Sequence, residues 1–419
     1  MLEKLTVKNF VVIRKAEIEL KKINIIIGPQ ANGKSLLAKL TYFFKSIPSI
    51  FIESIRSLDT KRELDTAILS QFEARFPRYS WDGTSFTIQY VAGAFSFLIE
   101  GKASKKGKTQ LKLSYPEAWL KLFNSKKISY KRKRESAQSD DPYMDDWRIM
   151  NKYVSGALQA EYDFFKGEPI FIPASRSFFA NLQKNIFTFL ASSLEIDLFL
   201  KDFGRMYEQS KRFYTDPYLV KRSLPVIERH KDLVESIMSG TYKYEDDQDW
   251  LISKGRKINL ANASSGQQES LPMLLVLMIW PSLRGGEPSD MYFIEEPEAH
   301  LFPTSQSRVV SLLSRIQHDC SSSFFITSHS PYILSAFNNL ILAQDTIDAG
   351  KISFDEFVKI NGPSQPIKFE DISAYTIDNG VSNPIADPEY RMIGADMLDG
   401  ISEHFEKVMN TLLSSEAEK

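Results

Sequence analysis

One octapeptide limits what this chain can fold into more than any other feature: Gly28-Pro29-Gln30-Ala31-Asn32-Gly33-Lys34-Ser35. It matches the phosphate-binding loop pattern G-x-x-x-x-G-K-[ST] at every specified position. The apolar run at residues 23–27 predicts a buried strand before the loop, and residues 35–46 predict a helix after it. The octapeptide therefore stands in the strand, loop and helix order that the motif requires.

This loop predicts a site for ATP and Mg²⁺. Its glycines let backbone N–H groups turn toward the phosphates, and the helix N-terminus adds partial positive charge. Lys34 is predicted to reach the β- and γ-phosphates, and the Ser35 hydroxyl to bind Mg²⁺. The alternative is a glycine turn that contains Lys-Ser by chance, which the flanking strand and helix disfavour. The predicted nucleotide contacts from the loop are Gly28, Gln30, Asn32, Gly33, Lys34 and Ser35.

A second apolar strand, at residues 291–294, ends in the carboxylates Glu295 and Glu296. A nucleotide hydrolase needs one acid near Mg²⁺ and another near the attacking water. We therefore predict that Glu295 is the metal-side acid and Glu296 the general base. Seen alone, such a pair is usually the solvated start of a loop.

A third buried strand, at residues 324–328, delivers His329 to the same edge of the sheet, where α/β sheets keep their ligand crevice. We predict that His329 senses the γ-phosphate, so that Lys34, Glu296 and His329 form the catalytic group. The alternative is a purely structural histidine.

The segment 263–269 precedes a long apolar run and contains Ser264 and Gly266. It resembles the signature motif of ABC-type ATPases, in which these two positions contact ATP held by the other subunit. That resemblance implies a two-fold dimer. The alternative is an ordinary Ser-Gly helix cap.

The segment 170–177 predicts a strand that runs into a loop at Arg176, where ABC proteins carry their Q-loop. Arg176 is predicted to face the nucleotide or to couple it to the neighbouring helical arm (181–254). A surface ion pair is the alternative, and the sequence does not decide between them.

Residues 295–303 and 327–332 together resemble the OLD-type branch of the ABC ATPases, which is similar to RecF, SMC and other DNA-repair ATPases. The resemblance covers roughly residues 1–50, 165–180 and 255–340. Gln30 replaces a frequent Asn of that branch, and Glu295 replaces a more widespread Asp. Both changes keep the chemical character of the side chain, so an active ATPase is still expected.

The branch supplies the ATPase subunits of bacterial anti-phage systems such as PARIS and Septu. The resemblance implies that ATP binding closes a dimer and hydrolysis opens it. In OLD proteins a TOPRIM-type nuclease domain follows the ATPase, but only ninety residues follow His329 and they contain no D-x-D pair. We therefore expect a separate effector protein, a nuclease of the TOPRIM or HNH type.

Composition places the chain among globular proteins, with 43% hydrophobic and 25% charged residues. We expect a cytoplasmic protein with no membrane contact, because neither a long apolar run nor a secretion signal occurs. The single cysteine, Cys320, is expected to be structural, and no zinc site is expected. ATP and Mg²⁺ are the cofactors that the sequence supports.

The basic segment, residues 102–134, carries twelve cationic side chains against Glu117 alone: Lys102, Lys105, Lys106, Lys108, Lys112, Lys121, Lys126, Lys127, Lys131, Arg132, Lys133 and Arg134. Alternating residues at 86–90, 95–99 and 110–114 predict strands. With Tyr115, Trp119, Phe123 and Tyr130 interleaved, the segment is predicted to contact DNA or an acidic protein that imitates DNA. The alternative is a solvated insertion neutralised by the acidic residues that follow it.

We predict an α/β fold: an ABC-type P-loop ATPase head with an antiparallel N-terminal layer, a basic β-rich insertion and a short helical arm. The expected divisions are the head (1–50, 165–180 and 255–345), the insertion (51–164), the helical arm (181–254) and an acidic C-terminal segment (346–419) that ends in a helix over 397–413.

The leading functional prediction is an ATP-hydrolysing subunit of an anti-phage system. It would act as a homodimer or a higher oligomer of dimers, sense infection and control the separate effector. The alternative is a RecF- or SMC-like DNA-binding ATPase of DNA repair or maintenance. A transporter ATPase is disfavoured, because nothing in the sequence indicates a membrane partner.

Overall fold

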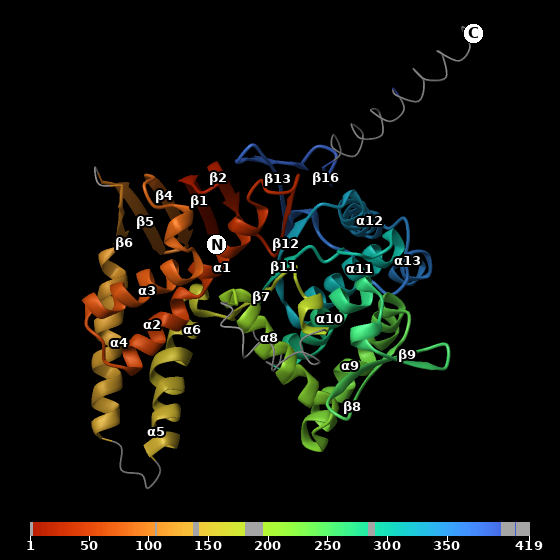
Figure 1. The fold of residues 1–419 in the computed structure, drawn as a ribbon, viewed down its shortest axis with the longest axis horizontal. Coiled ribbons are helices and arrows are strands. Elements are labelled where there is room, and N and C mark those ends of the chain that lie inside the picture. The colour runs from red at the N-terminus through yellow and green to blue at the C-terminus, as the bar shows by residue number, and fades with distance from the viewer. Residues whose placement is uncertain are drawn as a thin grey trace.

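The computed structural model describes residues 3–104, 107–136, 142–180, 196–283 and 290–394, and residue 407. An eleven-stranded sheet runs through the whole molecule in the order β6-β5-β4-β1-β2-β14-β13-β3-β12-β11-β7 (Figure 1). One half of this sheet is antiparallel and the other half mainly parallel. The predicted α/β class with an antiparallel N-terminal layer is confirmed.

The parallel half consists of β3 (Ile23–Ile27), β12 (Ser323–Ser328), β11 (Met291–Glu295) and β7 (Pro169–Ile172). These strands are buried on both faces, which explains why they read as continuous apolar runs. Alternate residues enter two different cores: Phe293 packs with α1 (Lys34–Lys45), whereas Tyr292 and Ile294 pack with helices of the other face. Those helices are α10 (Ser265–Leu283), α11 (Pro303–Cys320) and α12 (Pro331–Asp348).

The antiparallel half consists of β1 (Glu3–Phe10), β2 (Ile13–Glu19), β4 (Phe86–Ala92), β5 (Phe95–Ala103) and β6 (Thr109–Ser114). The strands predicted at 86–90, 95–99 and 110–114 are therefore present. They do not form a sheet of their own, because β4 pairs with β1 along its length and extends the central sheet.

The C-terminal segment contributes two strands to the middle of this sheet. β13 (Ile372–Asp378) lies parallel to β3, and β14 (Val381–Pro384) joins β13 to β2. Asn379 and Gly380 connect them with positive φ angles of 49° and 72°, as a two-residue hairpin turn requires. This hairpin links the two halves of the sheet, a role that the sequence reading did not assign to the segment. After it come the short strands β15 (Ala386–Asp387) and β16 (Met392–Ile393), whereas α13 (Phe354–Asn361) precedes it.

Helices α2 (Ile47–Arg56) and α3 (Lys61–Arg75) cover the antiparallel half beside α1. From them the long helix α4 (Glu117–Glu135) and its neighbour α5 (Pro142–Ile149) extend downward in Figure 1. A π-helical turn (Met150–Ser155) and α6 (Gly156–Glu161) return the chain to β7.

The description of the basic segment as β-rich is wrong for its second half, which is α4. Trp119, Phe123 and Tyr130 have exposures of 0%, because their spacing places them on the face of α4 that packs into the core. They cannot stack on nucleic-acid bases, whereas Lys131, Arg132, Lys133 and Arg134 remain exposed.

The predicted helical arm contains α8 (Leu198–Lys211) and α9 (Pro217–Met238). Both pack against α10, so they belong to the helical layer of the core and do not form a free arm. After α9 the chain forms a separate three-stranded antiparallel sheet of β8 (Thr241–Glu245), β9 (Gln248–Ser253) and β10 (Arg256–Asn259). Apart from residue 407, the helix predicted at 397–413 lies outside the described residues.

Among the residues that the structure describes, no helix has the length and apolar character needed to cross a membrane.

Candidate functional site

The phosphate-binding loop lies between β3 and α1 at the carboxyl end of the parallel strands. Gly28 and Gly33 have φ angles of 149° and 99°, which L side chains rarely adopt. A Cβ at Gly28 would lie 2.5 Å from the carbonyl oxygen of Ile377 in β13, so the loop also needs glycine for space. The C-terminal hairpin thus closes the back of the loop.

Lys34 is buried with 4% exposure, and its ammonium is held within the loop. Its Nζ donates to the carbonyl oxygens of Gly28 and Pro29, each at 2.7 Å, and lies 3.2 Å from Nδ1 of His329. Burial lowers the pKa of Lys34, while the charges of Glu296 and Glu298 oppose that change. The Lys34 ammonium therefore lies within the loop at which the phosphates are predicted to bind.

His329 connects Lys34 to Glu296. With Lys34 donating to Nδ1, the ring proton lies on Nε2, which donates to Oε1 of Glu296 at 2.9 Å. Glu296 itself has a φ of 45°, an unusual conformation for a non-glycine residue, and its backbone N–H is held by the Thr327 carbonyl. The three residues predicted to be catalytic are thus joined in one chain of contacts.

Glu295 lies beside the loop at the end of β11, where it is buried with 6% exposure. One carboxylate oxygen, Oε2, accepts from the backbone of Ala174 at 3.2 Å, while Oε1 is buried and has no partner among the described residues. Burial raises the pKa of Glu295, and the Ser35 hydroxyl is among the groups that oppose this rise. A buried oxygen without a donor, next to a hydroxyl, suits a Mg²⁺ ion that takes its other ligands from phosphates and water.

Glu298, which the sequence reading did not single out, holds the turn that carries His329. Its Oε1 accepts from the Ser328 hydroxyl at 2.7 Å and from the His329 backbone N–H at 2.8 Å. Burial raises the pKa of Glu298, and these two hydrogen bonds oppose the rise. Glu298 follows Glu296 by two positions in the sequence. That spacing alone did not indicate that its carboxylate would bind Ser328 and His329.

Arg176 is completely buried, with 0% exposure, so the surface ion-pair alternative is wrong. Its guanidinium donates to the backbone carbonyls of Pro173, Glu269, Glu295 and Glu296 at 2.6–2.9 Å. The Arg176 side chain therefore lies behind the acid pair and does not line the loop that faces the phosphates. It connects the acid pair to α10, whereas the predicted coupling was to the helical arm at 181–254.

The signature-like segment forms the beginning of α10. Ser264 and Ser265 are exposed, and the side chain of Gln267 accepts from both the backbone and the hydroxyl of Ser264 at 3.1 Å. Gly266 is buried, and a Cβ there would meet the His300 carbonyl oxygen at 2.7 Å. Ser264 therefore belongs to an ordinary cap and also presents a free face, so both predictions for it fit the geometry.

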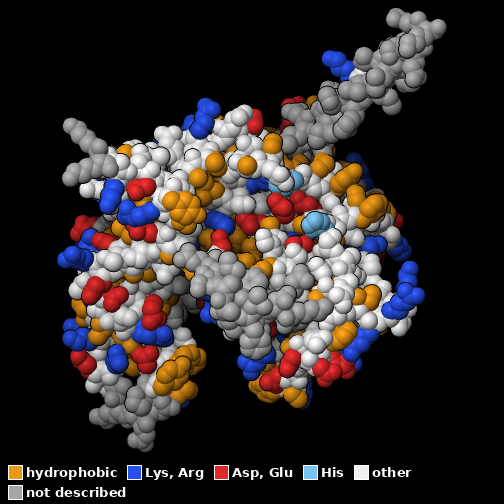
Figure 2. Space-filling model, viewed as in Figure 1, with side chains coloured by type: hydrophobic (Ala, Val, Ile, Leu, Met, Phe, Trp, Pro, Cys, Tyr) orange, Lys and Arg blue, Asp and Glu red, His pale blue; other side chains and the backbone are white. Residues whose placement is uncertain are grey.

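On the face shown in Figure 2, acidic side chains and two histidines gather near the middle of the molecule, with basic side chains beside them. The same region of Figure 1 shows the ends of β11 and β12. The carboxyl edge of the parallel strands therefore carries the charged groups of the site, as expected for an α/β sheet.

Residues 170–334 match the family model described as AAA ATPase domain, which covers β7, the signature-like segment, the acid pair and His329. No match to a curated protein was found.

Several solved structures share features of the fold. An SMC head bound to the C-winged helix domain of ScpA aligns with a TM-score of 0.38 and 12% identity, over 92% of this chain and 96% of that chain. The SMC head domain from Thermotoga maritima gives 0.35 and 14%, over 92% and 98%. The recombination mediator RecF gives 0.28 and 13%, over 92% and 98%.

Proposed function

We propose that this chain binds ATP with Mg²⁺ at the loop 28–35 and hydrolyses it, with Glu296 as general base. One observation carries the proposal: Lys34, His329 and Glu296 form a continuous chain of contacts beside the unpartnered carboxylate oxygen of Glu295. A glycine loop with a lysine would serve a purely structural turn equally well, but such a turn gives no reason to gather these four side chains.

Each residue has a distinct role in this proposal. Lys34 leaves the carbonyls of the loop and binds the β- and γ-phosphates, while Glu295 and Ser35 hold Mg²⁺. Mg²⁺ would neutralise charge that develops on the phosphate oxygens. Glu296 accepts the proton of the attacking water, and His329 orients Glu296 by donating its Nε2–H to the carboxylate. When Lys34 turns to the phosphates, Nδ1 of His329 loses its donor, which is how His329 would sense the γ-phosphate.

We also propose that two copies of the chain pair face to face, with Ser264 and Gly266 of one copy completing the site of the other. The exposed beginning of α10 supports this arrangement. Phe302 and Tyr332, exposed by 74% and 53%, begin the next two helices of the same layer, and a symmetric partner would cover apolar side chains of this kind.

For the biological role, we propose an ATPase subunit of an anti-phage system that controls a separate effector nuclease. The likeness of segments 295–303 and 327–332 to OLD-type ATPases supports it. The alternative, a RecF- or SMC-like DNA-binding ATPase, is supported by the four exposed cations at the end of α4. Because the aromatic residues of α4 are buried, that alternative requires contacts to DNA phosphates and not base stacking.

Two variants test the enzymatic proposal. Lys34→Ala should weaken ATP binding, whereas Glu296→Gln keeps the hydrogen bond to His329, removes the base and should retain bound ATP with turnover reduced about 10²–10⁴-fold. Steady-state phosphate release and filter retention of labelled ATP measure the two effects. A Glu296→Gln protein with normal turnover would refute the assignment of the base.

A further inference from the structure

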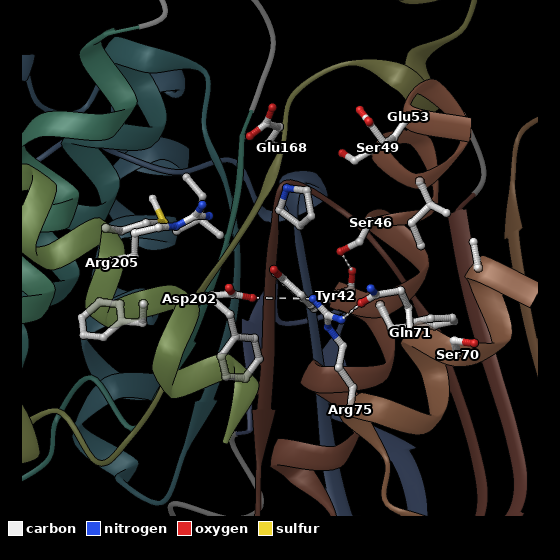
Figure 3. A pocket seen from close by; sticks show the side chains of 18 of the residues that line it. Tyr42, Ser46, Ser49, Glu53, Ser70, Gln71, Arg75, Glu168, Asp202 and Arg205 are labelled. Carbon is white, nitrogen blue, oxygen red and sulfur yellow. Dashed lines mark hydrogen bonds and ion pairs between the residues drawn. The ribbon is translucent and has the colours of Figure 1, made fainter. Parts of the chain in front are cut away.

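A cavity of about 620 Å³ lies outside the edge strand β7, away from the phosphate-binding loop (Figure 3). One wall consists of α1, α2 and α3, and the other of β7, α8 and the end of α10. We call this space the junction cavity. Its volume lies in the range of sites that hold small organic molecules.

The two walls differ in chemistry. The wall of α1–α3 presents the hydroxyl-bearing residues Ser46, Ser49 and Ser70. The opposite wall is mixed: the apolar side chains of Met206 and Trp280 lie beside the charged side chains of Glu168, Asp202 and Arg205. A ligand suited to this space has one hydrogen-bonding side and one flat apolar side.

Two arginines lie on opposite walls, and both have unused donors. Arg75 donates one Nη group to Gln71, but its Nη2 lies 3.6 Å from the nearest Asp202 oxygen, and its buried Nε has no partner among the described residues. Arg205, on α8, has no hydrogen bond or ion pair with any described residue. Figure 3 shows both side chains directed toward the space between the walls. A guanidinium with unused donors favours a carboxylate or phosphate oxygen.

The number of charges limits the ligand further. Four carboxylates line the cavity against two guanidiniums: Glu53, Asp59, Glu168 and Asp202 against Arg75 and Arg205. A triphosphate would meet more repulsion than attraction there, because like charges in partly buried surroundings interact unfavourably. The junction cavity is therefore unsuited to a second ATP molecule.

We propose that the junction cavity is a binding site for a small ring compound that carries one anionic group and a hydroxyl. Its anionic group lies between Arg75 and Arg205, its ring against Met206 and Trp280, and its hydroxyl toward the serines. The ligand joins α1, which begins in the phosphate-binding loop, to α8, which packs on the signature helix α10. Occupancy of the cavity and nucleotide affinity are therefore coupled reciprocally. The site itself does not depend on the function proposed above.

Salicylate is the probe for this test, because it combines a ring, a hydroxyl and one carboxylate. Its neutral analogue salicylamide has the same shape without the charge. We expect titration calorimetry of the full chain to show salicylate binding at least tenfold tighter than salicylamide. Phenyl phosphate forms a third arm: tighter binding than salicylate would assign the anionic group to a phosphate monoester, and weaker binding to a carboxylate.

Arg205→Gln is the decisive variant, because Arg205 is exposed and its loss leaves no described partner unpaired. It should weaken salicylate binding at least fivefold and leave salicylamide unchanged. Arg75→Gln should do the same. The matched control is Arg62→Gln, an exposed arginine on the same helix as Arg75 but outside the cavity, which should have no effect.

Two outcomes would overturn the proposal. The first is equal binding of salicylate and salicylamide, or unchanged salicylate binding in Arg205→Gln. The second is complete displacement of salicylate by Mg-ADP, since that would place the anion in the phosphate-binding loop.

Discussion

Replacing Arg176 by Met should separate the stability of the fold from the positioning of the general base. Met keeps the length and apolar stem of the side chain and removes every donor. Four carbonyl oxygens then lose a donor, those of Pro173, Glu269, Glu295 and Glu296, and the Glu269 carboxylate loses a cation at 3.7 Å.

The expected magnitude follows from burial. Each hydrogen bond to a charged group contributes about 1.5–3 kcal/mol, but the four are not additive, and Arg176 itself is costly to bury. Removing one partner of a buried charged pair typically costs about 3–5 kcal/mol, which we take as the loss in unfolding free energy. Such a loss is a large part of the ~5–15 kcal/mol that stabilises a typical domain.

The ATP turnover of Arg176→Met should also fall, because the general base is no longer held in position. Arg176 holds the carbonyls of the two peptide units that flank the Glu296 Cα, so without it the Glu296 carboxylate is no longer fixed relative to His329. A displacement of about 1 Å in a reacting group costs roughly 10²-fold in rate. Urea unfolding and ATP turnover per folded molecule measure the two effects.

Lys211→Met is the matched control. Lys211 is also a buried cation with 1% exposure, paired to Asp249 at 3.1 Å, but it lies on α8 away from the acid pair. The Lys211→Met protein should be less stable than the unmodified chain and keep the same ATP turnover per folded molecule. If Arg176→Met and Lys211→Met lose the same turnover, or if Arg176→Met unfolds at the same urea concentration as the unmodified chain, the positioning role is refuted.

Three other predictions follow from the described contacts. Glu298→Gln keeps an acceptor for Ser328 and His329 and removes a buried charge whose pKa is raised, so it should be as stable as the unmodified chain or more stable at pH 8. That advantage should shrink as the pH falls through the raised pKa toward the ordinary value of 4.5, because Glu298 then becomes neutral; urea unfolding at pH 5 and pH 8 checks the sign, and an advantage that grows on acidification contradicts it. Mixing Lys34→Ala chains with Gly266→Asp chains should restore about one working site per mixed dimer, and flat inactivity in dimers shown to be mixed counts against pairing in trans. Reversing the charges of Lys131 and Arg134 should lower the slope of log affinity for duplex DNA against log salt by about 0.9 for each lost phosphate contact, and an unchanged slope would remove the support for a DNA-maintenance role.

The parallel core was predictable because its sequence signals are local. Strands β3, β11 and β12 are buried on both faces and therefore appear as short continuous apolar runs that end in Gly28, Glu295 and Ser328. The phosphate-binding loop adds fixed spacing. The order of these elements then brings Lys34, Glu296 and His329 to one sheet edge without any knowledge of distant contacts.

The burial of Arg176 was not predictable in the same way. Its partners Glu295 and Glu296 are 119 and 120 positions away in the chain, and all four of its side-chain acceptors are backbone carbonyls. Every residue has a backbone carbonyl, so the sequence does not show which carbonyls a buried arginine will contact. By contrast, the sequence held a signal for the β13–β14 hairpin in the Asn379-Gly380 pair, and a helical period in Trp119, Phe123 and Tyr130 that the interpretation as a stacking surface overlooked.

The contacts of Arg176 also connect two parts of the chain that are predicted to contact different nucleotides. These are the signature-like segment at the start of α10 and the acid pair Glu295–Glu296. Glu269 lies within the first five residues of α10, three positions after Gly266, and both its carboxylate and its carbonyl oxygen hold Arg176. The remaining donors of Arg176 hold the carbonyls of Glu295 and Glu296. A movement of the beginning of α10 must therefore either carry the acid pair with it or break buried hydrogen bonds of a charged group. Breaking these hydrogen bonds is costly, so a nucleotide held by a partner copy at Ser264 would change the position of the general base of this copy. This coupling requires no contact between the two nucleotides.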